Sequence, residues 1–147
     1  MTRIPASIPT RILIVDQDRQ VGVALSRMLS TRSYEQVRAV RSARRAMAIT
    51  EQFRPEIIFV DLELPDDGTM AVARKLAQDV RRPRPRLIAL AMSAKSPGRE
   101  EARSAGFERW LVKPVSDEEL DRALGIVNRP DSTVRRPAPA DFDASPN

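Results

Sequence analysis

The chain has 147 residues, a formal net charge of +5 and an ordinary hydrophobic content of 41%. It contains neither cysteine nor histidine, which excludes disulfides, thiolate or histidine nucleophiles, histidine-based metal sites and a phosphohistidine on this chain. No apolar run approaches the length of a membrane span and no signal-like segment opens the chain. We therefore expect one soluble, cytoplasmic domain with no membrane partner.

The basic residues are mostly arginines, and many of them gather at residues 38–45 and 81–86. A basic surface can bind nucleic acid. The few aromatic residues are not interleaved with these clusters, so the pattern does not indicate base stacking. We interpret the clusters as solvated surface and do not expect a nucleic-acid partner; salt-dependent binding to duplex DNA is the alternative.

The first part of the chain predicts two strand-helix units after a flexible arm at residues 1–10. Residues 11–16 form an apolar run that ends in an acid, typical of a buried strand, and Asp18 is placed to cap the helix that follows. Residues 34–40 predict a weaker strand, and residues 42–53 predict a second helix.

The rest of the chain predicts three more units and a disordered tail. Its strands are expected at residues 56–61, 87–92 and 109–112, and its helices at residues 69–79, 97–105 and 116–127. Five alternating strands and helices predict an α/β fold with a doubly wound, five-stranded parallel sheet. Residues 128–147 are rich in Pro, Ala and Asp and predict a disordered tail, which leaves residues 11–127 as the folded domain.

Charged side chains stand where three of these strands end. Asp16 ends the first strand, Asp61 ends the third, and Lys113 follows the fifth. Ligand sites in open parallel sheets lie at the carboxyl ends of the strands, so we expect these groups to converge. Clustered carboxylates need a cation, and their oxygens suit Mg²⁺. A carboxylate beside Mg²⁺ can become an aspartyl phosphate, and Asp61 is the candidate nucleophile because its strand is the most apolar.

This pattern resembles the receiver domain of bacterial two-component response regulators. The resemblance rests on the block from Asp61 to Gly68 (DLELPDDG), on Lys113-Pro114, and on the spacing between Ala91 and that dipeptide. It implies the CheY-like, flavodoxin-like (βα)5 fold with strand order 2-1-3-4-5. A stand-alone receiver of this kind is not an enzyme beyond its own phosphorylation and dephosphorylation.

The resemblance also implies roles for single residues. Asp61 would be the phosphoacceptor, and Lys113 would contact the phosphoryl group. Asp16, Asp61 and the backbone carbonyl of Glu63 would hold Mg²⁺, with a further ligand from Gln17 or Asp18.

Two positions depart from the family pattern, and a third is unusual. Gln17 stands where the family carries a second acid, so we expect a weakened affinity for Mg²⁺. Ala91 occupies a switch position that normally carries Thr or Ser, and Trp110 occupies the aromatic switch position.

The expected function is to accept a phosphoryl group from a histidine kinase or a histidine phosphotransfer protein. The signal would leave through contacts with a downstream protein or a homodimer partner at residues 97–127. A pseudo-receiver that works without phosphate is the main alternative. A haloacid-dehalogenase-like phosphohydrolase is a remote one, because Asp16-Gln17-Asp18 resembles its Asp-x-Asp motif but leaves Asp61 unexplained.

Overall fold

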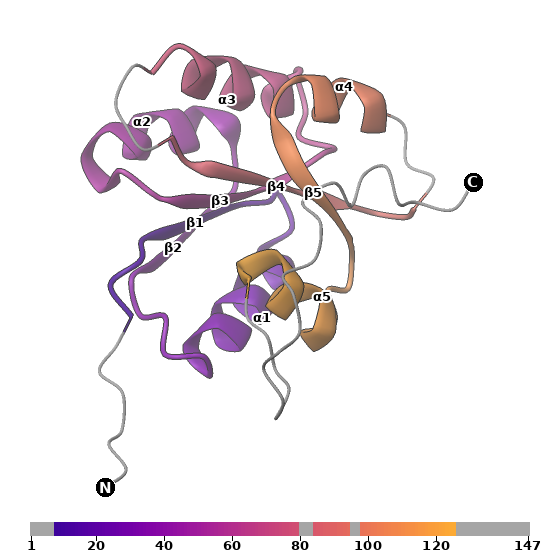
Figure 1. The fold of residues 1–147 in the computed structure, drawn as a ribbon. Helices are drawn as coiled ribbons and strands as arrows, with labels where there is room; N and C mark the ends of the chain where they lie inside the picture. The colour runs from indigo at the N-terminus through magenta and orange to yellow at the C-terminus, as the bar shows by residue number, and fades with distance from the viewer. Residues whose placement is uncertain (1–7, 80–83, 95–97, 126–147) are drawn as a thin grey trace, which may run out of the picture.

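The structure is a computed structural model, and it describes residues 8–79, 84–94 and 98–125. Five parallel strands form one sheet in the order β2-β1-β3-β4-β5, which confirms the predicted topology (Figure 1). The strands are β1 (Ile12–Val15), β2 (Val37–Val40), β3 (Ile57–Asp61), β4 (Arg86–Ala91) and β5 (Phe107–Val112). Most of the predicted arm and the whole predicted tail lie outside the described residues.

In the described ranges, four helices connect the strands and a fifth follows β5, and together they cover both faces of the sheet. They are α1 (Arg19–Ser30), α2 (Ala43–Phe53), α3 (Gly68–Ala77), α4 (Arg99–Ser104) and α5 (Asp117–Leu124). Helices α1 and α5 lie on one face, and α2, α3 and α4 lie on the other (Figure 1). The fold is therefore doubly wound, as the alternation of apolar strands and amphipathic helices predicts.

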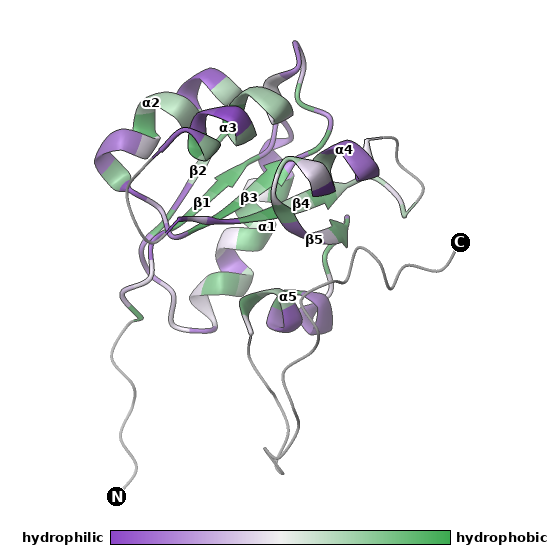
Figure 2. Ribbon diagram, turned by 45° about the horizontal axis from the view of Figure 1, so that its top comes forward, coloured by the Kyte–Doolittle hydropathy of each residue, from purple (hydrophilic) through white to green (hydrophobic). Residues whose placement is uncertain are grey.

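Alternate residues of the central strands supply two hydrophobic cores. Leu13 and Ile58 pack under α2, α3 and α4, whereas Ile14 and Phe59 pack under α1 and α5. Figure 2 shows the hydrophobic strands between helices whose outer faces are hydrophilic. Burying one such side chain contributes about 1.5–3 kcal/mol, so the strands form a rigid platform for the groups at their ends.

Side-chain caps fix where three of the helices begin. Asp18 accepts a hydrogen bond from the Gln20 N–H at the start of α1, as predicted. Ser42 caps α2 and Ser116 caps α5 in the same manner. A cap of this kind typically contributes about 1 kcal/mol, and the cap on α1 sets the direction in which the chain leaves β1.

Two strands differ from the predicted boundaries by two residues or more, and the other three differ by one residue at one or both ends. β5 begins at Phe107 rather than at residue 109, and a register shift between Leu87 and Ile88 accommodates the extra residue, Glu108. Charged residues within β5 interrupt its apolar pattern, so the sequence predicts a shorter strand. The predicted second strand starts later, at Val37, and Tyr34 instead forms an isolated bridge with Ile8.

Candidate functional site

An acid–lysine cluster, formed by Asp16, Asp61 and Lys113, lies at the carboxyl edge of the sheet. Asp16 directly follows β1, Asp61 is the last residue of β3, and Lys113 directly follows β5. The Lys113 ammonium donates to Asp16 Oδ2 at 3.0 Å and to Asp61 Oδ1 at 3.4 Å. Both aspartates are almost completely buried, with residue exposures of 2% and 1%. The structure thus brings together the three groups that the sequence placed at strand ends.

Local turns fix the orientation of both carboxylates. Asp16 Oδ1 accepts the Asp18 N–H at 2.8 Å, and Asp61 Oδ1 accepts the Glu63 N–H at 2.9 Å. The Thr69 hydroxyl donates to the Asp61 backbone carbonyl at 2.6 Å. Among the described residues, none donates a hydrogen bond to Asp61 Oδ2. The second oxygen of this carboxylate is therefore the one left open for another ligand.

Burial and charge oppose each other in the acid–lysine cluster. Burial raises the pKa of Asp16, hydrogen bonds from Asp18 and Lys113 lower it, the charge of Asp61 raises it, and the net pKa is above the ordinary value. Burial alone would lower the pKa of Lys113. Its hydrogen bond to Asp16 and the charge of Asp61 outweigh burial and raise it. Lys113 therefore stays protonated at neutral pH, while Asp16 bears a desolvation cost.

The structure gives Gln17 and Asp18 other partners. The Gln17 side-chain amide donates to the Glu63 backbone carbonyl at 2.9 Å. The Asp18 carboxylate caps α1 and is exposed to solvent. Gln17 thus bonds the carbonyl that the family resemblance assigns to Mg²⁺, and Asp18 serves as a helix cap.

The oxygen atoms of the site suit a hard divalent cation. Two buried carboxylates, those of Asp16 and Asp61, and the carbonyl of Glu63 are of the chemical type that Mg²⁺ prefers. Within the part of the chain that the structure describes, no three acidic, histidine or cysteine residues are grouped so as to hold a metal ion. The residues fit a cation in kind, with one carboxylate fewer than the family pattern carries.

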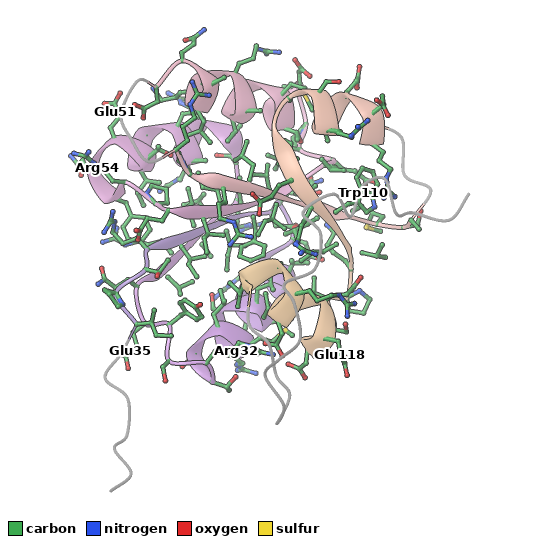
Figure 3. The ribbon with its side chains drawn as sticks, in the orientation of Figure 1. Arg32, Glu35, Glu51, Arg54, Trp110 and Glu118 are labelled. Carbon is green, nitrogen blue, oxygen red and sulfur yellow. The ribbon has the colours of Figure 1, made fainter. Side chains whose placement is uncertain are left out.

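The two positions that the resemblance predicts to be switches lie on β4 and β5. Ala91 is the fully buried last residue of β4, and its carbonyl accepts the Lys113 N–H at 2.8 Å. Its methyl group has no proton to donate to a phosphoryl oxygen. Trp110, labelled in Figure 3, is 7% exposed, and the Arg99 guanidinium lies 4.7 Å from the centroid of its ring. A cation–π contact with α4 thus holds this ring.

Sequence reasoning missed two contacts that shape the site. The buried Thr69 hydroxyl fixes the backbone of Asp61. The only sequence signal for this contact is the position of the Thr directly after Asp67-Gly68. The contact between Gln17 and Glu63 joins residues 46 positions apart, and no local pattern indicates it.

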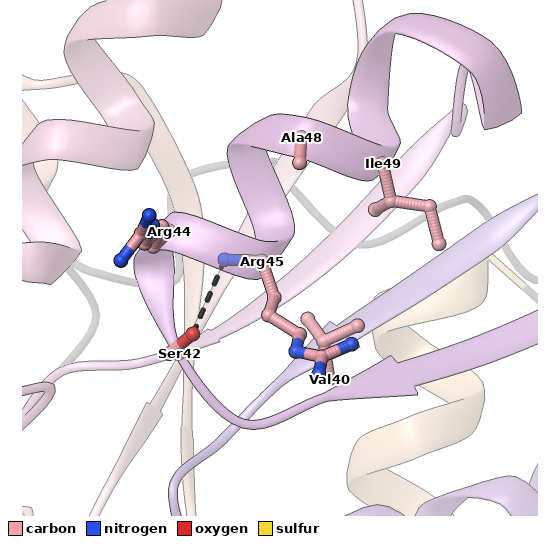
Figure 4. Close-up of a pocket in the computed structure, with 6 residues that line it drawn as sticks. All are labelled: Val40, Ser42, Arg44, Arg45, Ala48 and Ile49. Atoms are coloured by element: carbon pink, nitrogen blue, oxygen red, sulfur yellow. Dashed lines mark hydrogen bonds between the residues drawn. The ribbon is translucent and has the colours of Figure 1, made fainter.

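A separate surface hollow of about 620 Å³ lies beside the start of α2 (Figure 4). Two exposed arginines, Arg44 and Arg45, flank an apolar wall, and Ser42 Oγ accepts the Arg45 N–H there. Its lining is Val40, Ser42, Arg44, Arg45, Ala48 and Ile49. None of these residues belongs to the acid–lysine cluster, so mutations can change the two places separately.

Comparison with known families agrees with this geometry. A sequence profile of the response regulator receiver domain matches residues 12–125, and the chain belongs to this family. Receiver domains are signalling domains of two-component systems and generally bind Mg²⁺. Within the described ranges, every helix is too short or too polar to cross a membrane. Family membership gives no support to the phosphohydrolase alternative.

Two curated relatives of the chain carry names that describe different roles. The chain is 28% identical over 125 residues to the transcriptional regulatory protein PdtaR of Mycobacterium tuberculosis, covering 85% of this chain and 60% of PdtaR. It is 27% identical over 110 residues to the polar-differentiation response regulator DivK of Brucella anthropi, covering 74% of this chain and 88% of DivK. The chain therefore spans about 60% of the length of PdtaR.

Solved structures show the same fold. The signal receiver domain of a response regulator from Bermanella marisrubri is 27% identical, with a TM-score of 0.68; the match covers 80% of this chain and 98% of that one. A response regulator described as putative, from Chloroflexus aurantiacus, is 24% identical, with a TM-score of 0.72; the match covers 80% and 95%. The second likeness supports the fold alone.

Proposed function

We propose that this chain is a cytoplasmic receiver in a phosphorelay and that Asp61 is its phosphoacceptor. The donor would be a histidine kinase or a histidine phosphotransfer protein, and the domain would have no enzymatic activity beyond its own phosphorylation and dephosphorylation. The single observation that carries the proposal is the environment of Asp61. Its carboxylate is buried, Oδ1 is held by two donors, and Oδ2 accepts from no described residue.

In this proposal each residue would have its own part in phosphoryl transfer. Asp61 Oδ2 would attack the phosphorus atom, the new O–P bond would form as the N–P bond of the phosphohistidine breaks, and the imidazole would leave. Lys113 would place a fixed positive charge beside the transferred oxygens. The Glu63 N–H keeps the carboxylate from rotating.

The proposal includes a divalent cation, with oxygen atoms of the site as its ligands. Asp16, Asp61 and the Glu63 carbonyl would hold Mg²⁺, which when bound neutralises charge on the transferred oxygens. Gln17 and Asp18 are engaged in other contacts, so the proposal keeps the expectation of weakened affinity.

Output would pass through protein contacts rather than through nucleic acid. The surface of α4, β5 and α5, within residues 97–127, would contact a downstream protein or a second copy of the chain. Ala91 offers no hydroxyl at the end of β4. We therefore expect the signal to reach this surface by a route that does not depend on a hydroxyl at residue 91.

The test is intact-mass spectrometry after incubation with a small-molecule phosphodonor and Mg²⁺. We expect wild type to gain one phosphoryl group and Asp61→Asn to gain none. Asp66→Asn is the matched control, because it makes the same change on an exposed turn residue of the same loop; it should behave as wild type. A phosphoryl group on Asp61→Asn would contradict the assignment of the acceptor.

A phosphate-independent pseudo-receiver is the second candidate. The hydrogen bond from Gln17 to the Glu63 carbonyl and the missing hydroxyl at Ala91 favour it. No phosphoryl gain in wild type under the same conditions would select this candidate over the first.

A further inference from the structure

The carboxamide of Gln17 links the end of β1 to the loop that follows β3. Its Nε2 lies 2.9 Å from the Glu63 backbone oxygen. A carbonyl has no proton to donate, so only the NH₂ end of the carboxamide can face it favourably. The contact is therefore a true donor–acceptor pair.

The other oxygens of the site are also supplied with donors from the chain itself. Asp16 Oδ1 accepts from the Asp18 N–H, and Asp16 Oδ2 accepts from Lys113. Asp61 Oδ1 accepts from both the Glu63 N–H and Lys113. Of the oxygens that would face a cation, Asp61 Oδ2 alone has no described donor. A cation that binds to the others has to share these oxygens with protein hydrogen bonds or displace those bonds.

The choice of Gln at this position has two separate effects. A glutamate of the same length would bring an additional negative charge, and its carboxylate would repel the Glu63 carbonyl instead of binding it. Gln17 brings no charge and supplies the proton that the carbonyl needs. Such a donor stabilises the loop in the cation-free protein and competes with a cation for the same oxygen.

We propose that Gln17 is a positioning residue that holds the Glu63 carbonyl, and with it the loop at residues 62–67, in place without a divalent cation. The same hydrogen bond lowers the affinity of the site for a cation. This inference rests on the proposed function for its biological meaning, but its measurements need no phosphoryl transfer.

The first test measures the binding of Mn²⁺ alone by the electron paramagnetic resonance signal of the free ion. We expect Gln17→Ala to bind Mn²⁺ about twofold to tenfold more tightly than wild type, because one competing hydrogen bond is gone. Gln17→Glu should bind more tightly still. Gln20→Ala, an exposed change of the same kind at the start of α1, is the control and should match wild type. Equal or weaker binding by Gln17→Ala would overturn the proposal, and weaker binding would identify the Gln17 oxygen as a ligand.

The second test measures amide hydrogen exchange at Glu63 without divalent cation. Wild type and Gln20→Ala should protect this amide equally, and Gln17→Ala should exchange it several-fold faster because the loop loses its anchor. Unchanged exchange in Gln17→Ala would overturn the positioning role whatever the Mn²⁺ result. A failure of Asp61 to accept phosphate would leave both readouts intact, so the two proposals fail independently.

Discussion

Two ionic clusters in this molecule contain the same charges and behave differently. Each joins one basic side chain to two aspartates. The acid–lysine cluster comprises Lys113, Asp16 and Asp61, and the α1–α5 cluster comprises Arg32, Asp117 and Asp121. In the second cluster, Arg32 follows α1 and forms ion pairs with two aspartates of α5. Figure 3 labels Arg32 beside that helix.

The difference between the clusters lies in solvation and geometry. In the acid–lysine cluster the side chains of Asp16, Asp61 and Lys113 are 0%, 1% and 11% exposed. In the α1–α5 cluster the planar Arg32 guanidinium bonds Asp121 at 2.6 Å, and its other partner, Asp117, is 73% exposed.

The pKa shifts of Arg32 and Asp16 have different main causes in the two clusters. The hydrogen bond to Asp121 is the largest contribution to the raised pKa of Arg32, whereas burial is the largest contribution to the raised pKa of Asp16. The α1–α5 cluster is stabilising as it stands, and the acid–lysine cluster holds a carboxylate at a cost. An excess of buried negative charge is what a cationic ligand can relieve.

The largest effect on stability should come from removing the cation of the acid–lysine cluster. Lys113→Met leaves two buried carboxylates without their shared donor and should lower the free energy of unfolding by about 3 kcal/mol at neutral pH. Urea denaturation measures this. Lys75→Met, which breaks an exposed pair with Glu51, is the matched control and should change stability by less than about 0.5 kcal/mol. A loss as small as that of the control would show that Lys113 does not neutralise the aspartates.

A smaller loss should follow from removing the cation of the α1–α5 cluster. Arg32→Met should cost about 2 kcal/mol, because it leaves the mostly buried Asp121 unpaired while Asp117 remains solvated. Asp117→Asn should change the free energy of unfolding by less than about 0.5 kcal/mol. A greater loss for Asp117→Asn than for Arg32→Met would reverse the ranking of the two partners.

The smallest predicted change in the free energy of unfolding is an increase, and it concerns Asp16. Because the pKa of Asp16 is raised on folding, the folded chain binds more protons than the unfolded chain between the ordinary Asp pKa, about 3.9, and the raised one. This aspartate therefore costs stability above its raised pKa, and the cost disappears as the pH falls through that window.

Asp16→Asn should accordingly increase the free energy of unfolding slightly at neutral pH, because a neutral amide has no buried charge to desolvate. The gain should shrink towards pH 4, which denaturation at a series of pH values can measure. A variant less stable than wild type at neutral pH would show that pairing with Lys113 outweighs burial at Asp16.

Sequence patterns were sufficient for the sheet and for the charged groups at its edge. The apolar runs that end at Asp16 and Asp61 predict buried strands, and parallel strands bring their carboxyl ends together whatever the details of packing. The order of the strands followed from resemblance, since hydrophobic periodicity alone does not specify which strands are neighbours.

What the sequence could not predict depends on side-chain direction and exact register. Gln17 meets the Glu63 carbonyl only because β1 and β3 pair in one register, and Arg32 meets Asp121 across 89 positions. The extra residue in β5 escaped prediction because Glu108 and Arg109 interrupt its apolar pattern. These contacts arise from tertiary packing, which local propensity does not encode.

The bond between Lys113 and Asp16 spans 97 positions, from the end of the last strand to the end of the first. During synthesis, the aspartates emerge well before the lysine that neutralises them. The complete electrostatic arrangement can therefore form only when β5 has docked on β4. A chain interrupted before that strand would carry Asp16 and Asp61 without their lysine, so a complete acid–lysine cluster reports that folding has reached the far edge of the sheet.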